Sequence, residues 1–459
     1  MQKHHVVIVG GGFAGLAVAR GLRKAPVQIT LVDRTNHHLF QPLLYQVAMG
    51  GLNPAEIASP IRGVLRSQKN ATCWMGEVTA IDTEKKIVEL DNGGQKLQYD
   101  TLVLAAGGCT SYFGNDQWEK VAPGLKTISE ALEIRHRVLT ALEGAERTAN
   151  PEQRERLMTM VVIGGGPTGV EMAGGLAELT RSVLRWDYRQ IQPHQARVIL
   201  LEGGPRLLGV MPEQFSTYTA KRLKSMGVEV LLGERVLDLQ PGKVVTDKQE
   251  IQAENIIWAA GVGGNPIARL LGAETDRAGR VVVDPDMRVK GSANIYCLGD
   301  MASYCHPHTF GGKPLPGVAP VAMQQGKWAA KNILAQLKDK PTTPFEYFDK
   351  GTMATIGRTS AVAVSGPLKF TGLTAWFAWL FIHVAYLVDF QNQILVMMRW
   401  VWAYFTWKWN ARLITKVPSL QFCPNEPPKP DAGKPEEPVQ TETASPPPVE
   451  VAAAEEKGS

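Results

Sequence analysis

A glycine-rich loop between an apolar run and a helix start is the feature that most constrains the fold. Residues 6–15 read VVIVGGGFAG, which places Gly10, Gly12 and Gly15 in the spacing G-x-G-x-x-G. In this spacing the first glycine allows a tight turn, the second lets a pyrophosphate approach the backbone, and the third lets the helix pack closely on the strand. The positive end of the helix dipole also favours phosphate. The sequence therefore predicts a parallel strand, a phosphate-binding loop and a helix.

The segments after the loop favour a nucleotide site over an ordinary strand–turn–helix unit. Residues 27–32 (VQITLV) predict a second strand, which ends at Asp33. A carboxylate about 20 residues after such glycines can bind a ribose hydroxyl. Residues 101–108 (TLVLAAGG) predict a third buried strand, whose small terminal residues leave room for a ligand.

The pattern returns at residues 160–169, which read MVVIGGGPTG, and the next strand, 197–201, ends at Glu202. An acid at this place, with no arginine directly after it, favours a ribose with a free 2′-OH and thus NADH over NADPH. Arg206 is close enough in sequence to leave NADPH open. Residues 255–261 (NIIWAAG) repeat the closing strand of the first half. The alternative is a structural duplication that binds no second nucleotide.

Further elements are expected around these two units. Residues 294–300 (NIYCLGD) predict a buried strand that ends at Asp300, which could accept from a sugar-alcohol hydroxyl or cap the next helix. Residues 71–104 predict a β-meander. Residues 127–148 predict a helix with a capping box formed by Thr127 and Glu130.

Composition and cysteine usage narrow the class of protein. A chain of 459 residues allows two or three domains, and a net charge of +5 does not indicate nucleic acid. The five cysteines form no C-x-x-C pair, which favours a reducing compartment over a disulfide framework. A first strand at Val6 leaves no room for a targeting peptide. His37 and His38 lack a third ligand at metal spacing, so no metal is expected.

The order of these motifs resembles the two-dinucleotide-binding flavoproteins of the glutathione reductase-like fold, over about residues 5–340. The resemblance implies an α/β fold with two Rossmann-like domains, one for FAD (residues 1–112 and 289–345) and one for NAD(H) (residues 113–288). In the FAD domain it implies cofactor contacts at Gly10, Gly12, Phe13, Ala14, Gly15, Asp33, Arg34, Gln46, Val78, Ala106, Gly107, Gly299 and Asp300. In the NAD(H) domain it implies contacts at Gly164, Gly166, Pro167, Thr168, Gly169, Glu202, Val236 and Gly261, and the backbone at Val78 and Val236 would meet the two adenines.

A narrower resemblance rests on residues 40–48 (FQPLLYQVA), 164–171 (GGGPTGVE) and 319–326 (APVAMQQG), which look like type II NADH:quinone oxidoreductases. That family has a motif A-Q-x-x-x-Q at its quinone site. Gln324 matches its last residue, whereas Pro320 replaces the first glutamine. Glu171 matches a family glutamate near nicotinamide and flavin, linked to proton or substrate handling. The alternatives are a surface glutamine at 324 and a first-turn helix acid at 171.

The C-terminal third changes composition after short strands at 353–357 and 361–364. Residues 370–388 lack Asp, Glu, Lys and Arg, and are rich in Trp, Phe and Leu. This length is near that of a membrane span, but polar interruptions such as His383 favour a helix lying in the membrane interface.

A second helix is expected over about residues 394–416, with an apolar stripe of Trp402, Phe405, Trp409 and Leu413. A basic stripe of Lys408, Arg412 and Lys416 lies beside it and suits anionic lipid headgroups. A buried dimer interface is the alternative. Residues 346–417 are thus expected to form an amphipathic membrane-association region, and residues 418–459 a disordered tail.

Together these features predict a single-subunit, non-proton-pumping NADH:quinone oxidoreductase of a respiratory electron-transport chain. The resemblance implies a hydride from NADH to FAD N5, then two electrons to a membrane quinone. The expected protein is a homodimer, bound peripherally (monotopically) to the cytoplasmic face of a bacterial inner membrane. Two rivals stay open. One is a sulfide:quinone oxidoreductase, which needs paired cysteines such as Cys297 and Cys305. The other is a redox-sensing NAD(H)-binding flavoprotein resembling apoptosis-inducing factor.

Overall fold

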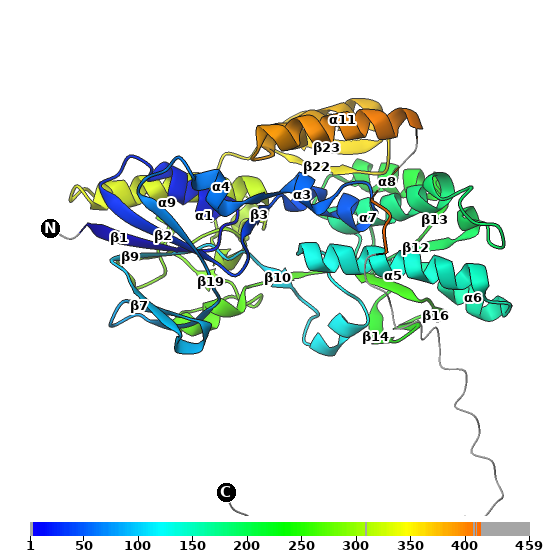
Figure 1. The fold of residues 1–459 in the computed structure, drawn as a ribbon, viewed down its shortest axis with the longest axis horizontal. Helices are drawn as coiled ribbons and strands as arrows, with labels where there is room; N and C mark the ends of the chain where they lie inside the picture. Colours follow the sequence, from blue (N-terminus) through cyan, green and yellow to red (C-terminus); the bar gives the residue numbers. More distant parts are fainter. Residues whose placement is uncertain (1–2, 308–309, 407–408, 410, 415–459) are drawn as a thin grey trace, which may run out of the picture. The chain divides into compact units, whose positions relative to one another are not determined.

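A five-stranded parallel sheet carries the first glycine loop in the computed structural model, which describes residues 3–307, 310–406, 409 and 411–414. Its strand order is β20 (Ile295–Cys297), β9 (Thr101–Leu104), β1 (His4–Val9), β2 (Val27–Asp33) and β5 (Ala71–Met75). The chain reaches β20 only after the whole second half. The carboxyl ends of these parallel strands therefore bring residues from distant parts of the sequence to one edge (Figure 1).

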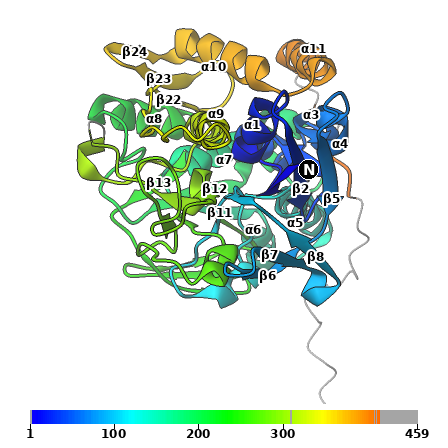
Figure 2. The ribbon, with the colours of Figure 1, turned by 90° about the vertical axis from the view of Figure 1, so that its left-hand side faces the viewer.

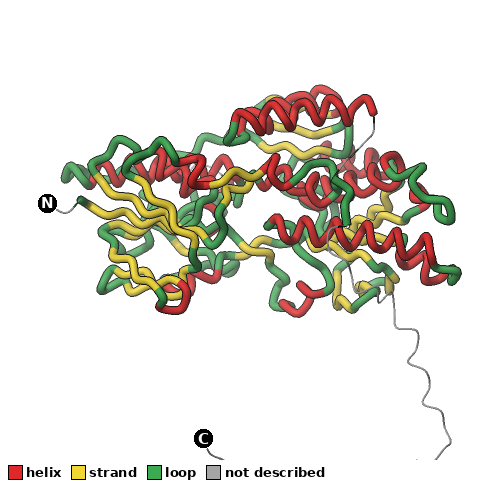
Figure 3. Tube along the Cα trace, in the orientation of Figure 1, coloured by secondary structure: helices red, strands yellow, loops and turns green. Residues whose placement is uncertain are grey.

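A second parallel sheet carries the second glycine loop. Its order is β13 (Val228–Leu232), β12 (Arg197–Glu202), β11 (Thr159–Ile163) and β17 (Asn255–Trp258). Each sheet is accompanied by an antiparallel one: β6 (Val78–Asp82), β7 (Ile87–Leu90) and β8 (Gln95–Gln98) in the first half, and β14 (Val236–Gln240), β15 (Lys243–Thr246) and β16 (Glu250–Gln252) in the second. The two halves thus repeat one architecture. Figure 3 shows strands and helices in each half.

The expected meander over residues 71–104 is correct only in part. Strand β5 pairs in parallel with β2, from Ile29 beside Ala71 to Asp33 beside Met75. The meander itself consists of β6, β7 and β8. The alternating pattern could not separate these roles, because an edge strand of a parallel sheet can also be half exposed.

Helices cover both sheets. They include α1 (Phe13–Gly21), α9 (Ala319–Gln336), α7 (Pro167–Glu178), α8 (Glu213–Ser225), α5 (Ile128–Arg147) and α6 (Pro151–Leu157). Helix α5 begins at the predicted capping box, in which Thr127 Oγ1 accepts from the Glu130 N–H and Glu130 accepts from the Thr127 N–H. A short pairing of β10 (Cys109–Thr110) with β18 (Val262–Gly263) joins the halves.

The remaining short elements connect this framework. They are β3 (His37–Leu39), α2 (Leu44–Ala48), α3 (Pro54–Ile57), β4 (Ala58–Pro60), α4 (Ile61–Leu65), β19 (Val281–Val282) and β21 (Ala302–Ser303).

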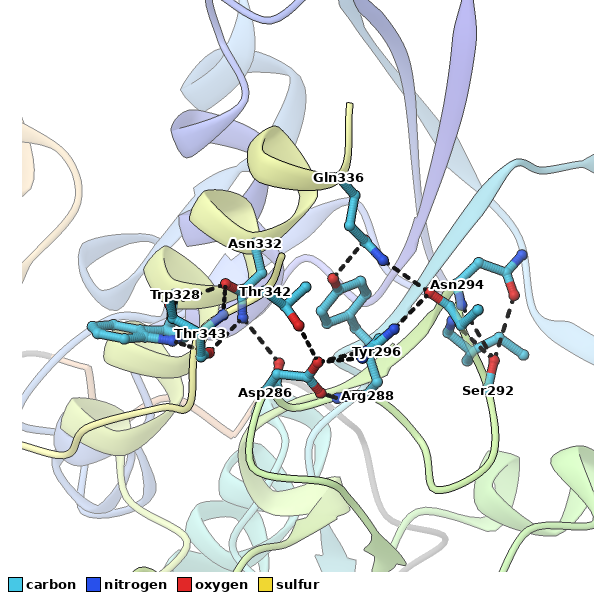
Figure 4. A network of polar contacts seen from close by, with 12 residues as sticks. Asp286, Arg288, Ser292, Asn294, Tyr296, Trp328, Asn332, Gln336, Thr342 and Thr343 are labelled. Atoms are coloured by element: carbon cyan, nitrogen blue, oxygen red, sulfur yellow. Dashed lines mark hydrogen bonds and ion pairs between the residues drawn. The ribbon is translucent and has the colours of Figure 1, made fainter. Parts of the chain in front are cut away.

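A polar network fixes helix α9 at its C-terminal half (Figure 4). Asn332 Nδ2 donates to the backbone oxygen of Asp286 at 3.3 Å and to that of Thr343 at 3.0 Å. The Tyr296 hydroxyl donates to Gln336 Oε1 at 2.7 Å. Because Tyr296 belongs to β20, these bonds hold α9 in register with the first sheet.

A C-terminal layer of strands and helices completes the described chain. It contains β22 (Thr352–Thr355), β23 (Ala361–Ser365), β24 (Leu368–Thr371), α10 (Gly372–Tyr386) and α11 (Phe390–Thr406). The two expected strands are confirmed. Helix α10 packs on this small antiparallel sheet, whereas α11 lies beside α10 and contacts α3 (Figure 2). Trp379 of α10 is buried against the core, whereas much of α11 is exposed.

The second C-terminal helix is shorter than expected, because α11 ends at Thr406. Residues 411–414 are not helical: the Ala411 N–H donates to the Gly50 oxygen, and Arg135 Nη1 donates to the Ala411 oxygen at 2.7 Å. These bonds turn the chain back onto the core. Lys408 and Lys416 lie outside the described residues, and Arg412 pairs with Asp187 rather than standing on a helix. In the part of the chain that is described, no helix combines the length and apolarity needed to cross a membrane.

Candidate active site

The first glycine loop has the geometry that phosphate binding requires. Gly10 has φ +105°, and a Cβ there would lie 2.4 Å from the Ala105 oxygen. A Cβ on Gly15 would lie 1.9 Å from the Gly10 oxygen, so only glycine lets helix α1 start this close to the turn. A Cβ on Gly12, in contrast, would make only an ordinary van der Waals contact, at 3.8 Å from the Ala105 oxygen. The loop is therefore closed toward the protein and open where a pyrophosphate would approach.

The second loop repeats this arrangement. Gly164 has φ +112°, and a Cβ on Gly169 would lie 1.7 Å from the Gly164 oxygen. A Cβ on Gly166 would meet no described atom within 4 Å. Pro167 and Thr168 form the first turn of α7, where proline fits because its missing N–H would have no helical partner.

An acid at the end of the second strand of each sheet supports its loop. Asp33 Oδ2 accepts from the Gly11 N–H at 2.6 Å, and Glu202 Oε2 accepts from the Gly165 N–H at 2.5 Å. Among the described residues, the guanidinium of Arg206 forms no hydrogen bond or ion pair with Glu202. It donates instead to the Met211 and Gly209 oxygens and to Ser216 Oγ.

The first sheet brings its other predicted residues to the same edge. Gly107 has φ +72° with open space beside it, and Gly299 donates its N–H to Gln325 Oε1 at 2.7 Å. Asp300 lies 3.6 Å from Lys126 Nζ and caps no helix with its side chain, so the helix-capping alternative is wrong. Ala106 accepts from Asn265 at 3.2 Å.

The other predicted cofactor residues take varied positions. Phe13 packs edge-on against His38, Ala14 is buried and Arg34 is exposed. Val78 follows Gly76, which donates its N–H to the Asp33 oxygen, and Val236 follows Glu234, which donates to the Glu202 oxygen. Gly261 has φ +83°.

His38 is a site residue whose role the sequence left unspecified. Its Nδ1 lies 3.0 Å from the Gly11 oxygen, and burial lowers the pKa of the imidazole to about 4. No described residue pairs with its buried Nε2. A neutral imidazole with an unpaired nitrogen beside the first loop suits a bound cofactor.

Glu171 lies in the second turn of α7, so the first-turn alternative is wrong. Its Oε1 accepts from the Thr355 N–H at 3.3 Å, and burial raises the pKa of the carboxyl to about 8. The Tyr45 hydroxyl lies 3.2 Å from Thr355 Oγ1. Burial also raises the pKa of Tyr45, and the negative charge of Glu171 raises it further.

A chain of polar contacts continues from Tyr45 to the C-terminal layer. Gln46 Nε2 donates to the Tyr45 hydroxyl at 2.9 Å, and Trp400 Nε1 donates to Gln46 Oε1 at 2.7 Å. Trp400 belongs to α11. The chain therefore links the exposed apolar layer with the buried carboxyl of Glu171, a connection between distant residues that sequence motifs could not reveal.

Gln324 of α9 binds backbone in both directions. Its Nε2 donates to the Phe348 oxygen and its Oε1 accepts from the Phe348 N–H, each at 3.0 Å. Gln324 is therefore more than a surface glutamine without contacts, because its amide binds the backbone of the segment that leads into β22. Gln325, which the sequence did not single out, is buried and binds Gly299.

Comparison with known proteins identifies the family. Residues 4–326 match the pyridine nucleotide-disulphide oxidoreductase family. The chain is 44% identical over 428 residues to the type II NADH:quinone oxidoreductase Ndh of Mycobacterium tuberculosis, covering 90% of this chain and 91% of that protein. It is 43% identical over 414 residues to NdhA of the same organism, covering 87% and 86%.

A solved structure of NDH2 from Plasmodium falciparum in complex with NADH has the same fold, with a TM-score of 0.82 at 20% identity, covering 90% of this chain and 100% of that one. The chain belongs to the pyridine nucleotide-disulphide oxidoreductase family and, within it, to the type II NADH:quinone oxidoreductases.

Proposed function

We propose that this protein is a single-subunit, non-proton-pumping NADH:quinone oxidoreductase that uses FAD. The observation that carries the proposal is the polar chain from Trp400 through Gln46, Tyr45 and Thr355 to Glu171. It joins the glycine-loop helix α7 to the apolar C-terminal layer, where a hydrophobic acceptor would arrive.

The residues present fit two dinucleotides. The backbone at Gly12 and Gly166, where no close neighbour blocks the approach, would hold the pyrophosphates, and Asp33 and Glu202 would bind ribose hydroxyls. Glu202 would also repel the 2′-phosphate of NADPH. FAD, when bound, supplies the two-electron chemistry between NADH and quinone. We assign the first loop to FAD because Asp300, Lys126 and His38 surround its edge of the sheet.

Glu171 would hold a proton for quinone reduction. A carboxyl with a pKa of about 8 is protonated at neutral pH. This carboxyl accepts a hydrogen bond from the backbone N–H of Thr355. General acids work best when their pKa is close to the working pH. Gln324 would shape the acceptor site indirectly, by holding the backbone of Phe348.

The acceptor would enter from a membrane surface along α10 and α11. Their exposed apolar side chains include Phe377, Phe381, Met398, Val401, Trp402 and Phe405. Exposed patches of this kind mark membrane or protein contacts. We propose peripheral binding to anionic lipid on the cytoplasmic face of a bacterial inner membrane, and a homodimer as the assembly.

The rival functions have less support. A sulfide:quinone oxidoreductase needs two reactive cysteines near the flavin, but Cys297 is buried and burial raises the pKa of its thiol to about 12, whereas Cys305 is exposed. A redox sensor would not need the apolar C-terminal layer.

Turnover of the purified, FAD-loaded protein tests the proposal. NADH, NADPH and sulfide are each supplied with a ubiquinone or a menaquinone analogue. We expect quinone-dependent oxidation of NADH in preference to NADPH, and no oxidation of sulfide. Sulfide-dependent quinone reduction would favour the first rival, and NADH binding without quinone turnover would favour the second.

A further inference from the structure

A cavity of about 440 Å³ with charged side chains in its wall lies outside the proposed redox site. The end of α7 and the turn after it contribute Glu178 and Arg181, and α8 contributes Arg222. The turn after β22 contributes Arg358, and Tyr404 of α11 completes the wall. Three separate segments therefore bring one arginine each to this cavity, and α11 contributes a fourth part of its wall.

The charges in this cavity do not balance. Glu178 is the one acid among the described residues that line it, against three guanidinium groups. The carboxyl accepts from the Arg358 backbone N–H, and burial raises its pKa to about 7, although Arg358 and Arg222 oppose that rise. Among the described residues of the cavity wall, Glu178 is thus the single acid that faces Arg181 and Arg222.

Two arginines also keep unused donors. Arg181 Nη2 donates to the Gly227 oxygen at 3.1 Å, and Arg222 Nη2 donates to the Arg358 oxygen at 3.5 Å. The Nε–H groups of Arg181 and Arg222 are buried and pair with no described atom. A buried donor without an acceptor is costly, and more so when it is charged. An anion in the cavity would remove this cost.

The geometry points to a phosphate group as the ligand, and we propose that the cavity binds one. Arginine forks match phosphate oxygens, and several arginines around one hollow are typical of phosphate recognition.

Two sources share this chemistry, an anionic phospholipid and free phosphate. Tyr404 favours the lipid, because it joins the cavity to helix α11. The centroid of its ring lies 4.2 Å from the guanidinium carbon of Arg358. The neighbouring residues of α11, Trp402 and Phe405, are 58% and 77% exposed and could contact acyl chains. In this form the inference deepens the proposed membrane binding, but the cavity itself does not depend on the redox activity.

A pair of double variants tests the proposal in the full-length, FAD-loaded protein. Arg181→Gln with Arg222→Gln removes two cavity charges. Arg185→Gln with Lys221→Gln removes two exposed charges next to them in sequence and serves as the control. The thermal midpoint is measured against inorganic phosphate at constant ionic strength, and against monomeric short-chain phosphatidylglycerol and phosphatidylcholine.

We expect the cavity variant to bind phosphate about tenfold more weakly than wild type, the effect of losing one charged hydrogen bond, and the control to stay within about twofold. A lipid source predicts tighter binding of phosphatidylglycerol than of phosphate, and a free phosphate source predicts the reverse; both support the site.

Equal losses in the two double variants would overturn the proposal, since phosphate would then bind elsewhere, for example at the glycine loops. Arg181→Gln alone covers the case in which the double variant fails to fold. NADH turnover with a soluble acceptor checks the redox function separately, and it should be unchanged in every variant.

Discussion

The carboxyl of Glu171 on α7 accepts a hydrogen bond from the backbone N–H of Thr355 on β22, at 3.3 Å. This contact joins the helix that starts at the second glycine loop to the first strand of the C-terminal layer. The Thr355 hydroxyl lies 3.2 Å from that of Tyr45, which belongs to the first half. Three parts of the chain therefore meet at one buried acid.

Replacing Glu171 by Gln should change how stability depends on pH. An unfolded glutamate ionises near pH ~4.3, whereas burial raises the folded pKa of Glu171 to about 8. Between these values the folded protein holds a proton that the unfolded chain releases, so the free energy of unfolding falls as pH rises. Glu171→Gln removes this pH-dependent contribution to the free energy of unfolding. Its melting temperature relative to wild type should therefore increase from acidic pH to about pH 8. Parallel melting curves for the two proteins would contradict the raised pKa.

Tyr45→Phe should slow the acceptor half-reaction. It removes the hydroxyl that contacts both Gln46 and Thr355, and two hydrogen bonds of about 1 kcal/mol each correspond to roughly 10- to 30-fold in rate. Stopped-flow mixing should show slower reoxidation by quinone and unchanged reduction by NADH. Tyr112→Phe is a matched control, since that hydroxyl donates to the Ala122 oxygen away from the polar chain. Equal effects of the two changes would argue against a role for the chain.

Glu202→Gln should narrow the preference for NADH over NADPH. Glu202 Oε2 accepts from the Gly165 N–H and Oε1 from the Gly204 N–H, so the amide keeps an oxygen for only one of them and loses the charge that repels a 2′-phosphate. We expect the ratio of the two kcat/KM values to fall by up to ~10-fold, the effect of one charged hydrogen bond. A wild-type protein that already prefers NADPH would refute this assignment of Glu202.

Gln324→Leu should impair quinone reduction while flavin reduction by NADH stays fast. The change removes both hydrogen bonds to Phe348 and so releases the segment before β22. At about 1 kcal/mol per bond we expect a loss of roughly 10- to 30-fold. Lys327→Leu, on an exposed position of the same helix, is the control. If both half-reactions slow equally, Gln324 serves the fold and not the acceptor site.

Phe381→Glu with Phe405→Glu should release the protein from vesicles. These side chains are 63% and 77% exposed, and their burial in lipid would contribute about 25 cal/mol per Å². Truncation before Phe370 would be a poorer test, because it also removes the buried Trp379 and Val396. The control is Trp186→Glu with Val210→Glu, on exposed residues outside the C-terminal layer. Unchanged sedimentation with vesicles would place the anchor elsewhere, and a wild type that stays soluble without lipid or detergent would favour a dimer interface.

The glycine loops were predictable because local geometry alone determines them. Gly10, Gly15, Gly164 and Gly169 stand where a side chain would collide with backbone, so the motif and the structure agree residue by residue. The capping box at Thr127 is local in the same way. The contacts of Gln46 were not predictable, since its partner Trp400 lies far along the chain.

The end of the second C-terminal helix could not be predicted from the sequence. Its apolar and basic spacing continues past Thr406, yet residues 411–414 leave the helix to bind Gly50 and Arg135. Tertiary hydrogen bonds overrode the periodic pattern there. The three arginines of the cavity at Glu178 were also not predictable, because three segments distant in sequence contribute one each.

One chain is expected to accept electrons from NADH and to deliver them to quinone through its bound flavin. Anaerobic sequential stopped flow tests this most directly. The FAD-loaded protein is mixed with one equivalent of NADH and then with a quinone analogue, while flavin absorbance is recorded. We expect complete bleaching of the flavin by NADH and full recovery on addition of quinone, with sulfide producing no bleaching. Flavin that NADH leaves oxidised, or reduced flavin that neither ubiquinone nor menaquinone analogues reoxidise, would contradict it.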